Sequence, residues 1–188
     1  MPIAKPKRQS EEELVETCTF FGTFIETRYD PKNIPEGDER LFYRVYCLCG
    51  LLDSDGMDCL LAQPQSEKSA MYKSAGKLGL TKLAKNAQAA DAALRRAGLS
   101  LKRKRDQQTI SEILKRFERV YFDRLRRAAY SRLYRLMEES DAFIPYALNC
   151  RRMQREGGNP FDPKEWTEDK IRGLMDERTR VAKRTRNA

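Results

Sequence analysis

Apolar residues recur every three or four positions along most of the chain, a spacing that places them on one face of an α-helix. The clearest case is the stretch 109–137, TISEILKRFERVYFDRLRRAAYSRLYRLM. Its apolar positions are Ile110, Ile113, Leu114, Phe117, Tyr121, Leu125 and Ala128. At about 100° per residue, the opposite side of the same helix is rich in arginine and lysine. The pattern therefore predicts one long helix with an apolar face for a core and a basic face for an anionic partner.

This predicted helix has a start signal and an irregular middle. Thr109 and Glu112 have the spacing of a capping box, in which each side chain accepts from the other residue's backbone. After Ala129 the apolar positions change phase, so Tyr130 and Leu133 point where the basic residues had pointed. The change predicts either a bend or different neighbours for the second half. No glycine or proline marks the break, so its position stays open.

The same spacing predicts further helices on both sides of this segment. We expect them from Ser10 to about residue 27, from Glu39 to about residue 52, over 81–97, over about 143–156, and after Asp162-Pro163. Residues 28–38 are expected to form a loop, and residues 63–79 a loop or a broken short helix. Strand signals are poor throughout. The fold class predicted is all-α, a helical bundle of about six helices in one or two lobes.

Charge is unevenly distributed along the chain. The 188 residues carry a net charge of +9, yet residues 1–100 hold 14 Lys and Arg against 14 Asp and Glu. Residues 101–188 hold 23 against 14, so the excess lies in the C-terminal half. We therefore divide the chain into a flexible basic arm, 1–9, an N-terminal helical lobe, 10–98, and a basic C-terminal helical lobe, 99–188. A localised, arginine-rich excess favours phosphate recognition, and a solubilising surface is the alternative.

Three groups of basic residues are candidate nucleic-acid contacts. They are the connector before the long helix, the basic face of that helix, and the lysines around Gly76-x-x-Gly79. In the same order, their residues are Lys102, Arg103, Lys104 and Arg105; Lys115, Arg116, Arg119, Arg126 and Arg127; and Lys73, Lys77 and Lys82. A GxxG turn can bring backbone close to a phosphate, but the Walker spacing of a nucleotide site is missing. The alternatives are a solvated linker and a solvated helix face. Tyrosines 121, 130 and 134 can stack on bases or belong to the core.

Other chemistry finds little support. The chain contains no histidine, which excludes a histidine general base and any zinc site built on imidazole. Cys47, Cys49 and Cys59 lack zinc-ligand spacing, and the aspartates of 53–58 lack that of a calcium loop, so we expect buried thiols and a solvated turn. We predict a protein that is not an enzyme and uses no metal or cofactor. Without a long apolar run or a secretory signal, a cytoplasmic protein that does not span a membrane is expected.

The segment LKRFERVYFDRLRRAAYSRLYRLMEESDAFIPYALNCRRM resembles the small subunit of CRISPR Cascade-type effector complexes. The matching motifs are Arg116-Phe117, Leu125-Arg126-Arg127, Arg132-Leu133, and Ile144-Pro145-Tyr146 through Arg151-Arg152. SAGKLGLTKLA, 74–84, is similar to the turn that opens an earlier helix of that family. The resemblance implies an all-helical, non-catalytic subunit whose copies assemble side by side along a guide RNA. It implies as partners guide RNA or single-stranded DNA, or both, and the other subunits of the effector.

The sequence thus predicts a non-catalytic, nucleic-acid-binding structural subunit of a ribonucleoprotein that contacts the phosphate backbone. Two other classes stay open. One is a stand-alone DNA-binding regulator, which needs a helix-turn-helix that the pattern does not show. The other is an adaptor or inhibitor that binds an acidic protein surface through the same arginines. RNA or DNA, sequence preference, copy number and partner chains are left undecided.

Overall fold

A computed structural model describes residues 9–156, 159, 164, 167, 169–170, 172–173 and 175–176. These residues are helical or irregular and include no strand, which confirms the predicted all-α class. No helix among them is long and apolar enough to cross a membrane. Most of the predicted arm, the end of a helix at Gly157-Gly158, and most of the helix predicted after Asp162-Pro163 lie outside the described residues.

The elements follow one another with short connections. The first half of the chain forms α1 (Glu11–Arg28), the 3-10 turn η1 (Pro31–Asn33), α2 (Asp38–Ser54), α3 (Gly56–Ala62), α4 (Gln65–Lys77) and α5 (Thr81–Arg96). The second half forms η2 (Lys104–Asp106), α6 (Gln107–Val120), the π-helical segment η3 (Tyr121–Leu125), α7 (Arg126–Glu139), η4 (Asp141–Phe143) and α8 (Ile144–Glu156).

The first helix begins as its sequence predicts. The Ser10 hydroxyl accepts from the Glu13 backbone at 3.1 Å, and the Glu13 carboxylate accepts from the Ser10 backbone at 2.7 Å. This capping box satisfies two amides that a helix start leaves without partners. Leu14, Cys18 and Ile25, which share one face of α1, are buried. That face packs against α2 and α7.

The prediction of a loop or broken short helix over 63–79 is wrong. Residues Gln65–Lys77 form the continuous helix α4, which packs against α2 and α5. Its buried face is narrow, since Met71 and Ala75 are its buried hydrophobic residues. Lys68 is also buried, and its ammonium donates to the carbonyl of Leu61 at the end of α3 at 2.8 Å. Two apolar positions are too few to reveal a helical period, so tertiary packing decides this helix.

The long helix 109–137 is interrupted and begins earlier than predicted. α6 begins at Gln107, so no capping box forms at Thr109, and the Glu112 carboxylate accepts from the Gln108 side chain instead. After Val120 the chain passes through the wide π turn η3 before α7 continues. A π turn inserts one residue into the helix and rotates everything that follows it. The predicted change of phase therefore arises at 121–125, a few residues before Ala129.

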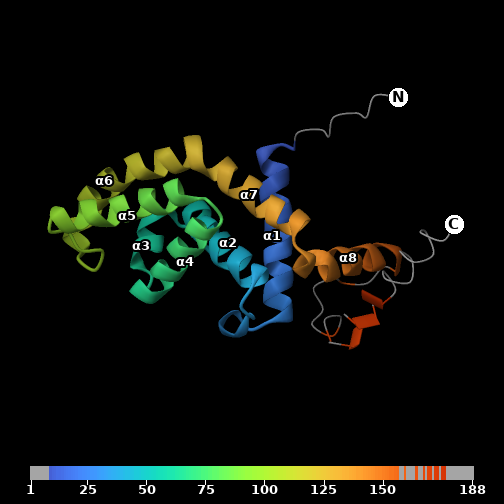
Figure 1. The fold of residues 1–188 in the computed structure, drawn as a ribbon. Helices are drawn as coiled ribbons and strands as arrows, with labels where there is room; N and C mark the ends of the chain where they lie inside the picture. Colours follow the sequence, from blue (N-terminus) through green and yellow to red (C-terminus); the bar gives the residue numbers. More distant parts are fainter. Residues whose placement is uncertain are drawn as a thin grey trace, which may run out of the picture.

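One hydrophobic core connects the two predicted lobes. This core includes Leu48 and Leu52 of α2, Ala87 of α5 and Leu133 of α7. The first three belong to the predicted N-terminal lobe, 10–98, and Leu133 belongs to the predicted C-terminal lobe, 99–188. Figure 1 shows α5 and α6 lying along each other and extending away from α1 and α8. α1 runs across the end of α7, while α3 and α4 lie beneath α5 in this view (Figure 1). The connector between α5 and α6 thus forms one end of the molecule.

Candidate nucleic-acid interface

Positive charge is concentrated in one continuous stretch of the fold. Residues 73–127, from the end of α4 to the start of α7, carry 16 Lys and Arg against five Asp and Glu, a net +11. Residues 9–72, which form α1, α2, α3 and most of α4, carry five against 13, a net −8. A division of the chain at residue 100 hides this contrast, because the basic stretch lies on both sides of it. The basic stretch therefore occupies the α5–α6 end of the molecule.

The outer face of α6 presents three of the predicted basic residues to solvent. Lys115, Arg116 and Arg119 are all exposed. Arg119 keeps 84% of its side chain exposed and makes a long contact of 3.4 Å with Asp123, itself 58% exposed. The guanidinium of Arg116 lies over the Phe117 ring, 4.5 Å from its centre. Exposed pairs of this kind contribute about 0–1 kcal/mol, so these cations stay available to an anion.

The acidic Glu118 does not neutralise this face, because it is turned toward α3. Its carboxylate accepts from the Met57 backbone at 3.0 Å, at the start of α3. A carboxylate at a helix N-terminus meets partner-free amides and the positive end of the helix dipole. Gly56 allows this approach: its φ is +85°, and a Cβ there would lie 3.0 Å from the Glu118 carboxylate oxygen. Glu112, an exposed acid earlier on α6, accepts from the Gln108 side chain at 3.0 Å.

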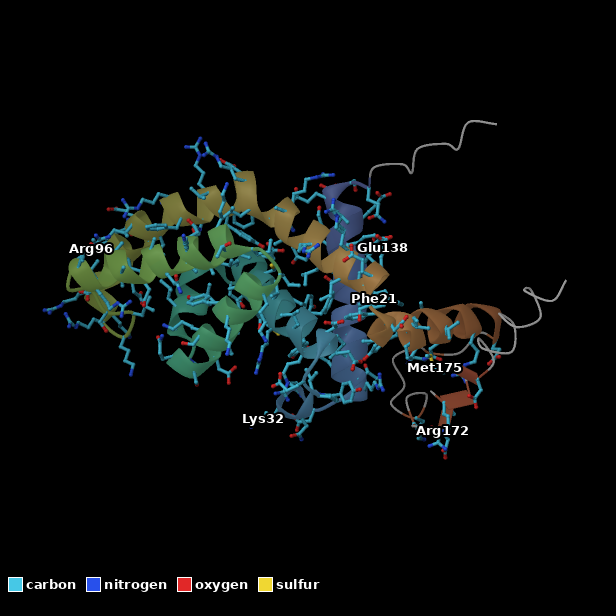
Figure 2. The ribbon with its side chains drawn as sticks, in the orientation of Figure 1. Phe21, Lys32, Arg96, Glu138, Arg172 and Met175 are labelled. Atoms are coloured by element: carbon cyan, nitrogen blue, oxygen red, sulfur yellow. The ribbon has the colours of Figure 1, made fainter. Side chains whose placement is uncertain are left out.

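The connector Lys102–Arg105 continues the basic face beyond the start of α6. Its four basic side chains are exposed, while Asp106 is buried and accepts from the Ser100 backbone at 3.0 Å. Two arginines make long contacts with Asp106, Arg103 at 3.7 Å and Arg105 at 3.6 Å. Asp106 therefore fixes the shape of the connector without covering its cations. Figure 2 labels Arg96 at this end of the molecule, distant from Glu138 at the end of α7.

Arg126 and Arg127, predicted to share the basic face, are used inside the fold. Arg126 keeps only 24% of its side chain exposed and binds Asp53 with two nitrogens, at 2.9 and 3.2 Å. Its third nitrogen donates to Glu11 at 2.8 Å. Arg127 donates to the carbonyl of Gln9 at 2.8 Å and is half-buried. Neither arginine is presented to a partner in the way that Lys115 and Arg119 are.

Asp53 is the centre of this arrangement, and the prediction that it lies in a solvated turn is wrong. Besides Arg126 it accepts from the Tyr121 hydroxyl at 2.9 Å and the Tyr130 hydroxyl at 2.8 Å. Burial raises the pKa of both tyrosines well above the usual value. These rings belong to the core, which excludes them as base-stacking residues, whereas Tyr134 is half-buried. Asp53 thus joins α2, η3 and α7.

The π turn explains why the sequence assigned Arg126 to the wrong face. In an uninterrupted helix, Leu125 and Ala128 would follow Tyr121 on the inner side. One inserted residue shifts the inner side to Arg126, Ala129 and Tyr130, and it leaves Ala128 exposed. Nothing in the residue types of 121–125 marks a π turn. The change of phase was the available signal. The partner of Arg126, Asp53, lies 73 residues away, and no local pattern connects the two.

The lysines near Gly76 lie on a different surface. Lys73, Lys77 and Lys82 are exposed, but of these only Lys73 lines the groove of about 590 Å³ between α4 and α5. The other cations there are Lys85 and Arg95 of α5, and the groove itself was not predicted because α4 was not expected to be a helix. Arg95 pairs with Asp91 at 2.8 Å. The Asn86 side chain donates to the Phe117 carbonyl of α6 from the opposite side of α5, so this groove is separate from the α6 face.

The turn between α4 and α5 has the length of a helix-turn-helix turn but a different geometry. Residues 78–80 form it, with Gly79 at φ +75°. Gln65 and Arg95, at the ends of α4 and α5 that are remote from the turn, line the same groove. The two helices therefore run alongside each other as a helical hairpin, whereas a DNA-binding helix-turn-helix crosses at roughly 90–120°.

Cys18 and Cys49 are buried, whereas Cys47 and Cys59, which were expected to be buried, are half-buried. Burial raises the pKa of Cys18 to about 12 and that of Cys47 to about 11. Cys49 is fully buried, and its pKa is raised too. In the described part of the chain, no three residues among the acids and cysteines gather to hold a metal ion.

The geometry instead provides a solvent-facing strip of cations, formed by the connector and the outer face of α6. Neither a family model, nor a curated protein, nor a solved structure matches the chain.

Proposed function

We propose that this protein is a non-catalytic, nucleic-acid-binding subunit that contacts phosphates through the connector Lys102–Arg105 and the outer face of α6. The observation that carries the proposal is a strip of seven exposed cations, four in the connector Lys102–Arg105 and three on the outer face of α6, in a molecule whose residues 9–72 carry a net −8. A solubilising surface would spread its charge over the whole molecule. A one-sided excess gives orientation to a long polyanion, whose counterions are released on binding.

The residue types favour backbone contact over sequence reading. Arg116 and Arg119 offer planar donor groups that match phosphate oxygens. The strip contains lysine and arginine with few amide side chains, and amides are the groups that read adenine edges. Binding of this kind positions a strand without selecting its sequence.

The cellular setting that we propose is a CRISPR effector complex, and its support is the sequence resemblance over residues 114–153. That segment corresponds to the second half of α6, all of η3, α7 and η4, and much of α8. Within the motif the arginines have two roles. Arg116 faces solvent, whereas Arg126 contacts Asp53 and Arg132 donates to the Leu78 carbonyl at 3.1 Å. Only the α6 part of the motif is therefore proposed to touch guide RNA or a single DNA strand.

Two alternative functions differ from this proposal in the ligand that the protein should bind. A stand-alone regulator should prefer one duplex sequence, and the hairpin geometry of α4 and α5 gives no support to it. An adaptor would use the same cations on an acidic protein. It should bind no oligonucleotide at 150 mM salt, conditions under which phosphate-contacting proteins retain measurable non-specific affinity.

The test is the salt dependence of binding to a labelled 20-nucleotide single strand, measured by fluorescence anisotropy. Lys115→Gln/Arg119→Gln should weaken binding and lower the slope of log K against log salt by about 0.7 for each lost phosphate contact. The matched control is Lys32→Gln/Arg172→Gln, which removes two exposed cations far from α6 (Figure 2). The control should bind like the wild type. Equal weakening in both variants, or a slope of zero for the wild type, contradicts the proposal.

The setting has its own test. A tagged chain purified from its native host should carry along guide RNA and the other effector subunits, detected by RNA sequencing and mass spectrometry. Recovery of a single acidic protein without nucleic acid would instead establish the adaptor.

A further inference from the structure

Phe122 is the most exposed large hydrophobic side chain among the residues that the structure describes. Its side chain is 48% exposed, and Val120, at 38%, is the other such residue. Phe122 lies in the π turn η3, beside the buried Tyr121, with the two ring centres 5.1 Å apart and the planes at 66°. A single exposed apolar side chain is common on protein surfaces, so the meaning of this ring depends on its neighbours, and sites that bind single strands combine aromatic rings with cations.

The ring stands in line with the cations of α6. Lys115, Arg119 and Phe122 are spaced by four and three residues, which places them in one stripe along the helix surface. Both cations are exposed, and the stripe spans about 10 Å at 1.5 Å per residue. The exposed Arg124 follows within η3. Phe122 is thus flanked along the chain by cations that can hold the phosphates on either side of a base.

The π turn is what places the ring there. Because η3 turns Tyr121 inward to donate to Asp53, the next residue points away from the core. Tyr121 is held at 2.9 Å from Asp53, so the direction of its neighbour is fixed by the core rather than left to a mobile loop. A rigid ring loses little conformational entropy on binding, which suits a stacking platform.

We propose that Phe122 stacks on an unpaired base of a single-stranded nucleic acid whose phosphates contact Lys115 and Arg119. This proposal rests on the proposed function and adds that the ligand is single-stranded. A base can stack on a ring carried by a helix only when it is not already paired and stacked within a duplex. A protein partner with an apolar patch is the competing occupant. The positive charge on this stripe favours the strand over such a patch.

The experiment compares two ligands that have the same backbone charge. One is a fluorescein-labelled 15-nucleotide oligothymidylate, and the other is a 15-unit abasic deoxyribose-phosphate strand of the same charge. Anisotropy titrations at 100 mM salt use the wild type, Phe122→Ala, Phe122→Leu and Phe122→Tyr. Val120→Ala, which trims the other exposed apolar side chain, serves as the matched control.

Phe122→Ala should weaken oligothymidylate binding about five-fold or more, the range of one base–aromatic stack, and should leave abasic binding unchanged. Phe122→Leu should lose as much, because it keeps apolar surface but has no ring, while Phe122→Tyr and Val120→Ala should bind like the wild type. Because Phe122 is exposed, all variants should keep the wild-type melting temperature.

Three results overturn the stacking proposal. Equal losses on both strands would make Phe122 a packing residue. Wild-type affinity of Phe122→Ala for oligothymidylate would assign the ring to a protein partner or to solvent, while the phosphate-binding function would stand. A wild type that binds neither strand would end the proposed function and the stacking together.

Discussion

α6 carries three basic residues and α7 carries four within one predicted helix, yet the two helices use them differently. On α6 the cations Lys115, Arg116 and Arg119 face solvent. On α7 the guanidinium of Arg126 binds Asp53 and Glu11, and that of Arg132 donates to the Leu78 carbonyl at the end of α4. The two helices differ by the single inserted residue of η3. The comparison shows that helical phase, rather than residue type, decides whether an arginine stabilises the fold or is free for a ligand.

Alkaline pH should have the largest effect, because burial keeps protons on thiols that pack inside the fold, whereas the α6 cations are exposed. Cys18, whose thiol contacts the Tyr130 carbonyl at 3.7 Å, has its pKa raised to about 12 by burial, from an ordinary value of 9.0. Cys47 has its pKa raised to about 11. The folded protein therefore holds protons that the unfolded chain releases above pH 9, so stability is full below pH 9 and falls as the pH rises.

Above pH 9, Cys18 and Cys47 should each lower the free energy of unfolding by about 1.4 kcal/mol per pH unit. Together they should lower it by about 5 kcal/mol at pH 11. Urea unfolding between pH 8 and 11 measures this loss. Cys18→Ala should show a shallower fall with pH than the wild type, and Lys115→Gln/Arg119→Gln the same fall. A wild-type stability that does not change up to pH 11 would contradict the burial of these thiols.

Asp53→Ala should have the next largest effect. It leaves Arg126 with one of its two acidic partners and removes the acceptor of the Tyr121 and Tyr130 hydroxyls. Losing one partner of a largely buried ion pair should cost about 3 kcal/mol in urea unfolding. Asp55→Ala, an exposed aspartate two residues later, should stay within about 0.5 kcal/mol of the wild type. Equal unfolding midpoints for the two variants would show that Asp53 does not hold α2 to α7.

The smallest expected effect on stability belongs to α6. Lys115→Gln/Arg119→Gln removes two exposed cations and keeps good helix formers, so each change should shift the unfolding free energy by less than about 0.5 kcal/mol. Arg126→Gln, one conservative change on α7, should cost more than both together. Urea titration of the three proteins at pH 7 makes the comparison. If the α6 variant proved the less stable, the proposed binding face would be part of the fold.

Local pattern was sufficient for the helical class, for the start of α1 after Ser10, and for α5, which was predicted over 81–97 and spans Thr81–Arg96. In each case the residues that act are neighbours in sequence, as with Ser10 and Glu13. The same locality predicted that Lys115, Arg116 and Arg119 would be exposed on one face, since the period between them and the core residue Leu114 is uninterrupted.

The sequence by itself determined an all-α chain whose basic residues gather before and within the long helix 109–137, because periodicity and charge are properties of neighbouring residues. Tertiary structure decided the rest. It made a helix of 65–77, placed Asp53 where it can bind Arg126 some 70 residues later, and put a π turn between α6 and α7. That turn buries Tyr121 and exposes Phe122. Partners so distant in sequence leave no periodic signal, and only packing brings them together.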